Sequence, residues 1–321
     1  MLGGGTINIG FIGPGKVGVS LGRYFTHKGL NVIGFYGRDL ENTMKAANIT
    51  KSKVYSSLKD IIEESNILFI TTPDDTISII DTEISNFNLN LKNKSICHTS
   101  GSLSSNLLSN VKHSGALTYS IHPIYAFSNQ NTNLKDLETI YFSIESNNVD
   151  EKCEIIALMK SLNNKYFIRN IESSSSYHLA TVLVSNLVLS LLQIGTNYFE
   201  EFGLSEKESL EALKPLINGN INNIFENGFV KSLTGPVSRG DIIPIKKHLS
   251  SINKDHKEIY KKLSLNLLNL VALKEKTNTL NNFNEDFALK DLIHNSNEYK
   301  KVYEILGGIE YEKYNSNISR I

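Results

Sequence analysis

The sequence contains no tryptophan and only two cysteines, Cys97 and Cys153, among its 321 residues. These two cysteines provide neither a disulfide framework nor the spacing of a metal site, so we expect no metal and a reducing compartment, the cytoplasm. A surplus of positive charge is also missing, because 33 lysines and arginines balance 33 aspartates and glutamates. This balance argues against a nucleic acid or an anionic membrane bound through bulk charge.

A long hydrophobic run is missing as well. The most apolar stretch, residues 179–192, contains Ser185, Asn186 and Ser190 and is too short to span a bilayer. We therefore predict a buried helix here and no membrane partner. Residues 1–6 precede the first predicted strand, and they are too few for a signal peptide.

A glycine-rich stretch near the N-terminus organises the chain. Residues 7–12 form a short apolar run, after which apolar residues recur at helical spacing as far as Phe25. This change of period places the glycines at a strand-to-helix junction. Dinucleotides bind at such junctions because the glycines permit a tight turn, a close approach of pyrophosphate and close helix packing, with phosphate at the helix N-terminus. We predict a cofactor loop made of Gly13, Pro14, Gly15, Lys16, Val17 and Gly18.

The second predicted strand, residues 31–36, is followed by Gly37, Arg38 and Asp39. An NAD site holds a carboxylate near this point for the ribose 2′-hydroxyl, whereas this chain has Gly37 and then Arg38. Because a guanidinium can pair with a 2′-phosphate, the sequence favours NADP(H) over NAD(H). Two other interpretations stay open: Arg38 is a solvated turn residue, and Asp39 binds the ribose or caps the next helix.

Later strands are predicted at residues 67–72, 95–99, 116–121, 139–144 and 165–171, with a helix at 150–162. Ligands bind at the carboxyl ends of parallel strands, so Thr72, Pro73 and Ser100 are expected to line the cofactor groove. His98 and His122 also fall at strand ends. For each of them a ligand contact and a structural role both remain open.

From residue 173 the pattern is helical to the end of the chain. Residues 177–202 predict one long helix that ends at Gly203, and Ser205 with Glu208 forms a capping box for the next helix. Asp255 and Glu258 repeat that signature. The chain is thus predicted to be an α/β Rossmann domain with a doubly wound, mainly parallel sheet at residues 1–172, followed by an all-α domain at 173–321.

Polar residues on the predicted long helix need an explanation. His178, Thr181 and Ser185 share one helix face, with Asn186 beside them, among leucines, valines and alanines. An unpaired buried polar group costs about 1 to 3 kcal/mol, so these groups need partners. Either they form a polar network between helices or at a dimer interface, or they line a substrate pocket that faces the nicotinamide.

Residues 234–241, Thr-Gly-Pro-Val-Ser-Arg-Gly-Asp, form a second unusual segment. Its glycines and proline predict a fixed turn, after which Asp241 can cap the helix that carries Lys247 and His248. Either this turn only connects two helices, or Thr234 and Arg239 converge there to bind an anion.

These segments resemble a family of Rossmann-like proteins whose C-terminal helical domain has no assigned function. The matching segments are residues 13–18, His98 to Gly101, His122-Pro123, Tyr177-His178 with Ser185-Asn186, and 234–249. The resemblance implies an NADP-dependent oxidoreductase, distantly similar to pyrroline-5-carboxylate reductase and to β-hydroxyacid dehydrogenases. The latter carry a catalytic lysine, followed four residues later by asparagine, on the interdomain helix. This chain has no lysine between Ile171 and Phe202.

We therefore predict an NADP(H)-dependent oxidoreductase that acts on a small, anionic carbonyl or imine, as a homodimer formed through the helical domain. The alternative is a non-enzymatic NADP(H)-binding sensor. Imidazole can transfer a proton near neutral pH, which makes His178 the candidate acid/base group. The other residues predicted for the substrate site are Asn186 and Ser185 as orienting groups, Arg239 as an anion clamp, and His122, Thr234 and Asp241.

Overall fold

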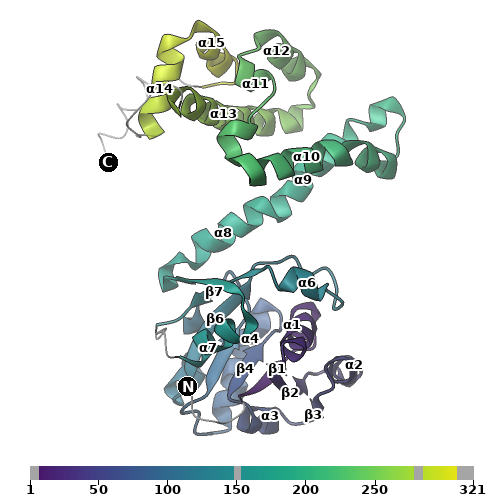
Figure 1. Ribbon diagram of the computed structural model, residues 1–321, viewed down its shortest axis with the longest axis vertical. Coiled ribbons are helices and arrows are strands. Elements are labelled where there is room, and N and C mark those ends of the chain that lie inside the picture. Colours follow the sequence, from purple (N-terminus) through teal and green to yellow (C-terminus); the bar gives the residue numbers. More distant parts are fainter. Residues whose placement is uncertain (1–6, 148–152, 278–284, 309–321) are drawn as a thin grey trace. The chain divides into compact units, whose positions relative to one another are not determined.

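The computed structural model describes residues 7–147, 153–277 and 285–308. The chain forms two compact units, Met1–Leu189 and Ser190–Ile321. The first unit holds the strands, and the described part of the second is helical (Figure 1). Residues 1–6, on which the signal-peptide expectation rests, and residues 150–152 of the predicted helix 150–162 lie outside the described residues. The domain boundary between 172 and 173 stays a prediction.

The first unit is built on one eight-stranded sheet with the order β3-β2-β1-β4-β5-β6-β7-β8 (Figure 1). Neighbouring strands are parallel, except that β6 and β7 are antiparallel. Strand order reverses next to β1, which creates the topological switch point where doubly wound sheets bind ligands. The strands are β1 (Asn8–Ile12), β2 (Asn31–Tyr36), β3 (Lys53–Tyr55), β4 (Ile67–Ile70), β5 (Ser95–His98), β6 (Leu117–Pro123), β7 (Tyr141–Glu145) and β8 (Lys165–Arg169).

Helices cover both faces of this sheet. Ile9 and Phe11 of β1 belong to one apolar cluster with residues of α1 and α7, whereas Ile12 belongs to a second cluster with residues of α3, α4 and α5. Alternate residues of a strand point to opposite faces, so a strand buried on both sides is a continuous apolar run. The helices of this unit are α1 (Lys16–His27), α2 (Leu40–Thr50), α3 (Leu58–Glu64), α4 (Asp74–Asn86), α5 (Ser109–His113), α6 (Leu134–Leu137), α7 (Glu154–Leu162) and α8 (Ser174–Val184).

The second unit packs its helices around α13. Leu268, Val271 and Ala272 of α13 are buried in two apolar clusters that also contain residues of α11, α12, α14 and α15 and Leu233, which follows α10. Helix α9 (Asn186–Asn197) contains the point at which the chain divides into the two units. The remaining helices are α10 (Glu206–Ser232), α11 (Pro236–Arg239), α12 (Ile242–Ser251), α13 (Lys254–Thr277), α14 (Glu285–Asn295) and α15 (Asn297–Ile305).

The predicted fold class is confirmed, and its errors are local. The strand β3 was missed, because three residues are too short for an alternating pattern. The Ser205 capping box is confirmed, since its side chain accepts from Glu208 N and Glu208 bonds back to Ser205 N. The prediction that Asp255 caps a helix was wrong. Helix α13 begins at Lys254, one residue before Asp255, and Asn253 Oδ1 accepts a hydrogen bond from Asp255 N at 3.1 Å.

The predicted buried helix at residues 179–192 was wrong in two respects. The helix is interrupted at Ser185, whose φ and ψ of −116° and −75° separate α8 from α9. Its apolar side chains are also exposed, with Val184 75% and Leu189 67% accessible. The segment Ile171–Phe202 is long and apolar enough to cross a membrane, although one such helix is weak evidence for a membrane span. Apolar composition predicted burial, but among the described residues no other element covers these side chains.

Candidate functional site

The turn between β1 and α1 has the geometry of a phosphate-binding loop. Gly13 has a φ of +99°, a left-handed conformation that residues with a Cβ rarely adopt. Its N–H donates to Tyr36 O at 2.9 Å, and Thr71 Oγ1 donates to its carbonyl oxygen at 2.7 Å. A Cβ on Gly18 would lie 2.5 Å from that same carbonyl oxygen and would also clash with Thr71. The fold of the turn therefore requires glycine at positions 13 and 18.

Gly15 differs from these two glycines, because the fold does not require it. Its φ of −80° is an ordinary value, and the nearest atom to a Cβ built there is Thr71 O at 3.7 Å. It occupies the N-cap position of α1, where no side chain caps the helix and no acidic residue lies in the first turn. The helix N–H groups are thus free to bind an anion, and the missing Cβ leaves room for a pyrophosphate to approach.

A cavity of about 410 Å³ opens at the carboxyl ends of β1, β2 and β4, beside the switch point of the sheet. Four of the predicted cofactor residues, Lys16, Val17, Gly18 and Ser100, do not line it. Among the described residues, no group of His, Cys, Asp or Glu could hold a metal ion. The predicted cofactor residues that do line the cavity are Gly13, Pro14, Gly15, Gly37, Arg38, Thr72 and Pro73.

The end of β2 explains the sequence Gly37-Arg38-Asp39. A Cβ on Gly37 would lie 2.6 Å from Pro14 Cδ, so no carboxylate side chain fits at this position. Asp39 Oδ1 accepts from Asn42 N at 3.1 Å and Oδ2 accepts from Asn42 Nδ2 at 2.6 Å. Asp39 is therefore the cap of α2, as one interpretation of the sequence held. Arg38 is exposed and lines the cavity, with its guanidinium available to a ligand.

The loops after β4 and β5 lie next to each other. Thr72 lines the cavity, and its Oγ1 is buried without a hydrogen-bond partner among the described residues. A buried hydroxyl without a partner costs about 1 to 3 kcal/mol, so a ligand that bonds to it would be favoured. Ser100 Oγ donates to Asp74 Oδ2 at 2.9 Å, and Ser102 Oγ donates to the same oxygen at 2.7 Å. These two bonds tie the loop after β5 to the start of α4.

The contacts of His98 are those of a structural residue, because both ring nitrogens bond to backbone groups. It ends β5 and is fully buried. Its Nδ1 accepts from Ser100 N at 3.3 Å, and Nε2, which carries the proton in that tautomer, donates to Ser104 O at 3.2 Å. Burial lowers the pKa of His98, which keeps the ring neutral.

His122 lies near the end of β6 and is only partly buried. Its Nδ1 is 2.6 Å from the Tyr177 hydroxyl oxygen, and the two rings meet edge to face with centroids 5.6 Å apart. The imidazole rests against Gly101, where a Cβ would lie 3.1 Å from Nε2. Tyr177 was not among the predicted site residues. Its only sequence signal was its position in the motif that it shares with His178.

Electrostatics keep His122 neutral. Its pKa is lowered to about 4, chiefly by burial, with His178 and Arg169 acting in the same direction and Asp74 opposing them. We predict that this depressed pKa makes folding pH dependent. The unfolded chain takes up a proton below about pH 6.5 and the folded protein does not, so stability is lost as the pH falls from 6.5 towards 4.

Between pH 7 and pH 5 the expected loss is about 2 kcal/mol, from about 1.5 pH units at 1.36 kcal/mol each. Urea denaturation at several pH values would measure it. His122→Asn keeps a polar atom for Tyr177 but does not titrate, so this variant should show a flatter dependence. An unchanged slope would contradict the assignment.

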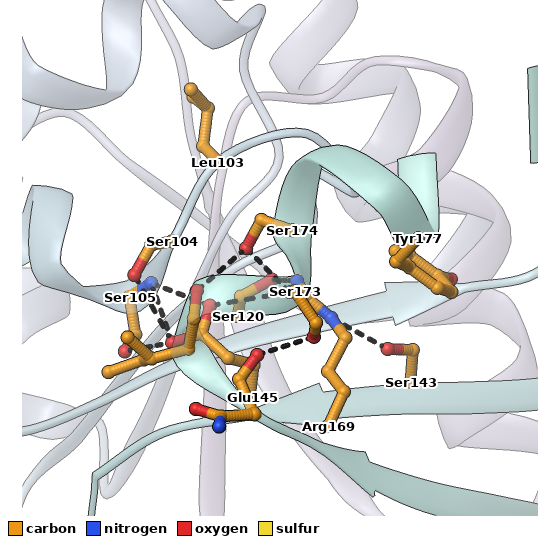
Figure 2. Close-up of polar contacts among 12 residues, drawn as sticks. Leu103, Ser104, Ser105, Ser120, Ser143, Glu145, Arg169, Ser173, Ser174 and Tyr177 are labelled. Atoms are coloured by element: carbon orange, nitrogen blue, oxygen red, sulfur yellow. Dashed lines mark hydrogen bonds and ion pairs between the residues drawn. The ribbon is translucent and has the colours of Figure 1, made fainter. Parts of the chain in front are cut away.

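A buried ion pair lies behind this site and was also missed from the sequence. Arg169 Nη1 is 3.7 Å from Glu145 Oε2, and both side chains are almost fully buried (Figure 2). Arg169 donates to three serine hydroxyls, and Glu145 accepts from the backbone and side chains of the loop after β5. The residues around the pair are Ser143, Ser174 and Ser120 on Arg169, and Ser104 and Ser105 on Glu145. Sequence could not pair two residues that lie on different strands.

None of the predicted residues of the long helix is buried, and the hydroxyls of Thr181 and Ser185 bond to neighbouring residues of the same segment. Ser185 Oγ donates to Thr181 O at 2.6 Å and to Asn186 Oδ1 at 2.9 Å, while Thr181 Oγ1 donates to His178 O at 2.8 Å. The imidazole of His178 makes no hydrogen bond among the described residues and is exposed. The premise that these polar groups are buried was therefore wrong for a single copy of the chain. The roles assigned to His178, Ser185 and Asn186 stay predictions.

The predicted anion turn lies in the second unit. Gly235 and Gly240 have φ values of +91° and +69°, so the turn has the fixed form expected from its glycines. Arg239 Nε donates to Asp241 Oδ2 at 2.8 Å. Asp241 occupies the N-cap position of α12 but makes no capping bond, because its carboxylate pairs with Arg239. Thr234 is exposed.

Comparison with known proteins supports this architecture. Residues 3–123 match a Rossmann-like domain, and residues 140–267 match DUF2520, a domain of unknown function. A Bacteroides fragilis protein named as a candidate NADP oxidoreductase is 19% identical, with a TM-score of 0.62 over 81% of this chain and 97% of that chain. Protein TM1727 from Thermotoga maritima is 26% identical, with a TM-score of 0.60 over 84% of this chain and 97% of that chain.

A third solved structure carries a cofactor. Pyrroline-5-carboxylate reductase from Plasmodium falciparum, with NADP bound, is 14% identical, with a TM-score of 0.56 over 92% of this chain and 98% of that chain. No curated protein matches the chain. The chain therefore joins a Rossmann-like domain to a DUF2520 domain, and its fold is similar to that of NADP oxidoreductases.

Proposed function

We propose that this protein is an NADP(H)-dependent oxidoreductase that transfers hydride to or from a small, anionic carbonyl or imine. The observation that carries the proposal is the cavity at the switch point, which joins the free N-terminus of α1 to an exposed arginine at the end of β2. Similar folds that bind NADP, such as the Plasmodium falciparum reductase, support the choice of cofactor.

The residues of the cavity fit the parts of NADP(H). Gly15 and the first N–H groups of α1 would hold the pyrophosphate, and Arg38 would pair with the 2′-phosphate. The buried Thr72 Oγ1 would gain the hydrogen bond that it lacks among the described residues. When bound, the cofactor supplies the hydride, and the chain supplies orientation and proton transfer.

Arg38→Ala is expected to weaken NADPH binding about tenfold to a hundredfold while leaving NADH binding nearly unchanged. A charge-assisted pair with phosphate contributes about 1.5 to 3 kcal/mol, and NADH has no 2′-phosphate. Fluorescence titration with both reduced cofactors measures the two affinities. Lys45→Ala, in which an exposed cation of α2 outside the cavity is removed, serves as the matched control. A wild-type preference for NADH, or equal losses for both cofactors in Arg38→Ala, would refute the NADP(H) assignment.

For the substrate we retain the residues that the sequence predicted. Arg239 would hold the carboxylate of the substrate, with Thr234 and Asp241 shaping its turn, and Ser185 and Asn186 would orient the substrate. NADPH absorbance should be followed with pairs of small ketones and cyclic imines that differ only in a carboxylate. Wild type should turn over the carboxylate member faster, and Arg239→Ala should remove that preference. A protein that binds NADPH and oxidises it with no member of the panel would be a sensor instead.

We further propose a homodimer formed through α8 and α9. Residues 173–199 contain no Asp, Glu, Lys or Arg, and several of their leucines and valines are more than half exposed. Cores of interfaces between proteins are depleted of charge in this way. A second copy of the chain is the occupant that brings an equally apolar segment, through a two-fold axis.

Light scattering at micromolar concentration should therefore give the mass of a dimer. Val184→Asp should shift the protein to a monomer, because a carboxylate buried at the interface would lose its hydration. Met44→Asp, which changes an exposed apolar residue of α2, is the control and should leave the dimer intact. A wild-type monomer would rule out the proposal, and binding to lipid vesicles would point to a membrane surface instead.

A further inference from the structure

His122 and Tyr177 form a hydrogen-bonded pair, and the direction of this bond decides the tautomer of the histidine. The 2.6 Å bond joins Nδ1 to the phenol oxygen. Burial raises the pKa of Tyr177, so the phenol keeps its proton at neutral pH and can donate it to Nδ1. The proton of the neutral imidazole then lies on Nε2. Among the described residues Nε2 makes no hydrogen bond, so its N–H is available to a ligand.

The buried cation Arg169 holds Tyr177 in place. Its guanidinium carbon lies 4.9 Å from the centroid of the Tyr177 ring, within the range of a cation–π contact. Three hydrogen bonds to serines on β6, β7 and α8 fix the guanidinium itself. The phenol therefore presents its hydroxyl to His122 from a rigid support (Figure 2 shows Arg169 beside Tyr177).

A series of contacts leads from the cofactor cavity to this pair. Pro73 lines the cavity, and the next residue, Asp74, accepts a hydrogen bond from Ser100 at 2.9 Å. Gly101, which follows Ser100, touches the imidazole of His122. The strands β4, β5 and β6 are parallel neighbours, so the loops after them lie along the same edge of the sheet. In doubly wound folds this edge carries the ligand crevice.

We propose that His122 is the proton donor at the nicotinamide end of the crevice. Tyr177 is the positioning residue that fixes the Nε2–H tautomer of His122. The substrate atom that accepts the His122 proton is a neutral carbonyl oxygen or imine nitrogen. The inference rests on the proposed oxidoreductase function and names its acid/base group.

The step balances without a further reactant. When bound, the cofactor would supply the hydride to the substrate carbon, and the substrate oxygen or nitrogen would take the Nε2 proton of His122. The Tyr177 hydroxyl passes its proton to Nδ1, which leaves a neutral imidazole, and water returns a proton to the phenolate beside Arg169. A neutral imidazole suits this step because a positive charge here would add to that of Arg169. His178 itself is exposed, and no hydrogen bond from the part of the chain that the structure describes holds its ring in one orientation.

The first experiment needs no substrate. In protein labelled with ¹⁵N-histidine, the His122 ring nitrogens should show the neutral Nε2–H tautomer at pH 7. Adding NADP⁺ should shift these signals, whereas 2′-phospho-ADP-ribose, which lacks the nicotinamide, should not. An Nδ1–H tautomer, or the same response to both ligands, would overturn the inference. Binding of NADP⁺ without any change at His122 would overturn it while leaving the proposed function standing, and absence of NADP⁺ binding would overturn both.

Tyr177→Phe tests the positioning role. This variant should give a mixture of the two His122 tautomers with NADP⁺ affinity retained, whereas a residue that only supports the fold would leave the tautomer unchanged. His113→Asn, which changes an exposed histidine of α5, is the control. With any member of the carbonyl and imine panel that is turned over, His122→Asn should lower kcat by about 2 to 4 orders of magnitude. A larger loss in His178→Ala than in His122→Asn would overturn the assignment.

Discussion

Gly15→Ala is expected to fold as stably as wild type and to bind NADPH about tenfold or more weakly, which corresponds to about 1.4 kcal/mol. The expectation rests on the geometry of the turn, in which a Cβ at this position is 3.7 Å from the nearest protein atom. The backbone φ of −80° suits alanine equally well. The methyl group therefore costs the folded protein nothing but occupies the space that the pyrophosphate would take.

Gly18→Val serves as the contrasting variant. Its Cβ would meet the Gly13 carbonyl oxygen at 2.5 Å, so the helix must move away from the turn. We expect a loss of about 3 kcal/mol in unfolding free energy, measured by urea denaturation, together with loss of binding. Gly219→Ala, at a helical position where a Cβ meets nothing within 4 Å, controls for the general effect of the substitution. NADPH binding by Gly15→Ala with wild-type affinity would show that the pyrophosphate is not bound at this turn.

Most of the sheet could be predicted from the sequence because each strand is a local pattern. Residues 67–70 are apolar without interruption since both faces of β4 are buried, and the glycine turn marks where β1 gives way to α1. The three residues of β3 carry no such pattern. The exposure of α8 could not be predicted either, because apolar composition indicates that a surface is covered but not what covers it.

The cofactor side of the site was predictable for the same reason, since the glycines, Arg38 and Pro73 follow strands at known offsets. The other side was not. The contact between His122 and Tyr177 joins residues 55 positions apart, and Arg169 meets Glu145 across neighbouring strands. Such pairs depend on how neighbouring strands are aligned with each other. The spacing of apolar residues along one strand does not determine that alignment. Packing also explains why position 37 carries no carboxylate. Pro14 occupies the space that a side chain on Gly37 would need.

Arg169→Met is expected to cost about 3 to 5 kcal/mol of unfolding free energy, because it removes one partner of a buried ion pair. The Glu145 side chain is fully buried, so water cannot replace the lost cation. Three serine hydroxyls would also lose the guanidinium bonds that hold β6, β7 and α8 together. Urea denaturation at pH 7 measures the loss, and Lys53→Met, which breaks the exposed pair with Glu64 at 2.8 Å, should change stability little.

The double variant Arg169→Met with Glu145→Gln separates the charge from the packing. Glutamine keeps an oxygen to accept from Ser105 N, which lies 3.0 Å from Glu145 Oε2, and leaves no buried charge without a partner. The double variant should therefore be more stable than Arg169→Met, so that the two losses are not additive. The guanidinium carbon of Arg169 also lies 4.9 Å from the centroid of the Tyr177 ring. Both variants should therefore give a mixture of the two His122 tautomers. Additive losses would contradict a direct ion pair, and a loss in Arg169→Met no larger than in Lys53→Met would contradict its burial.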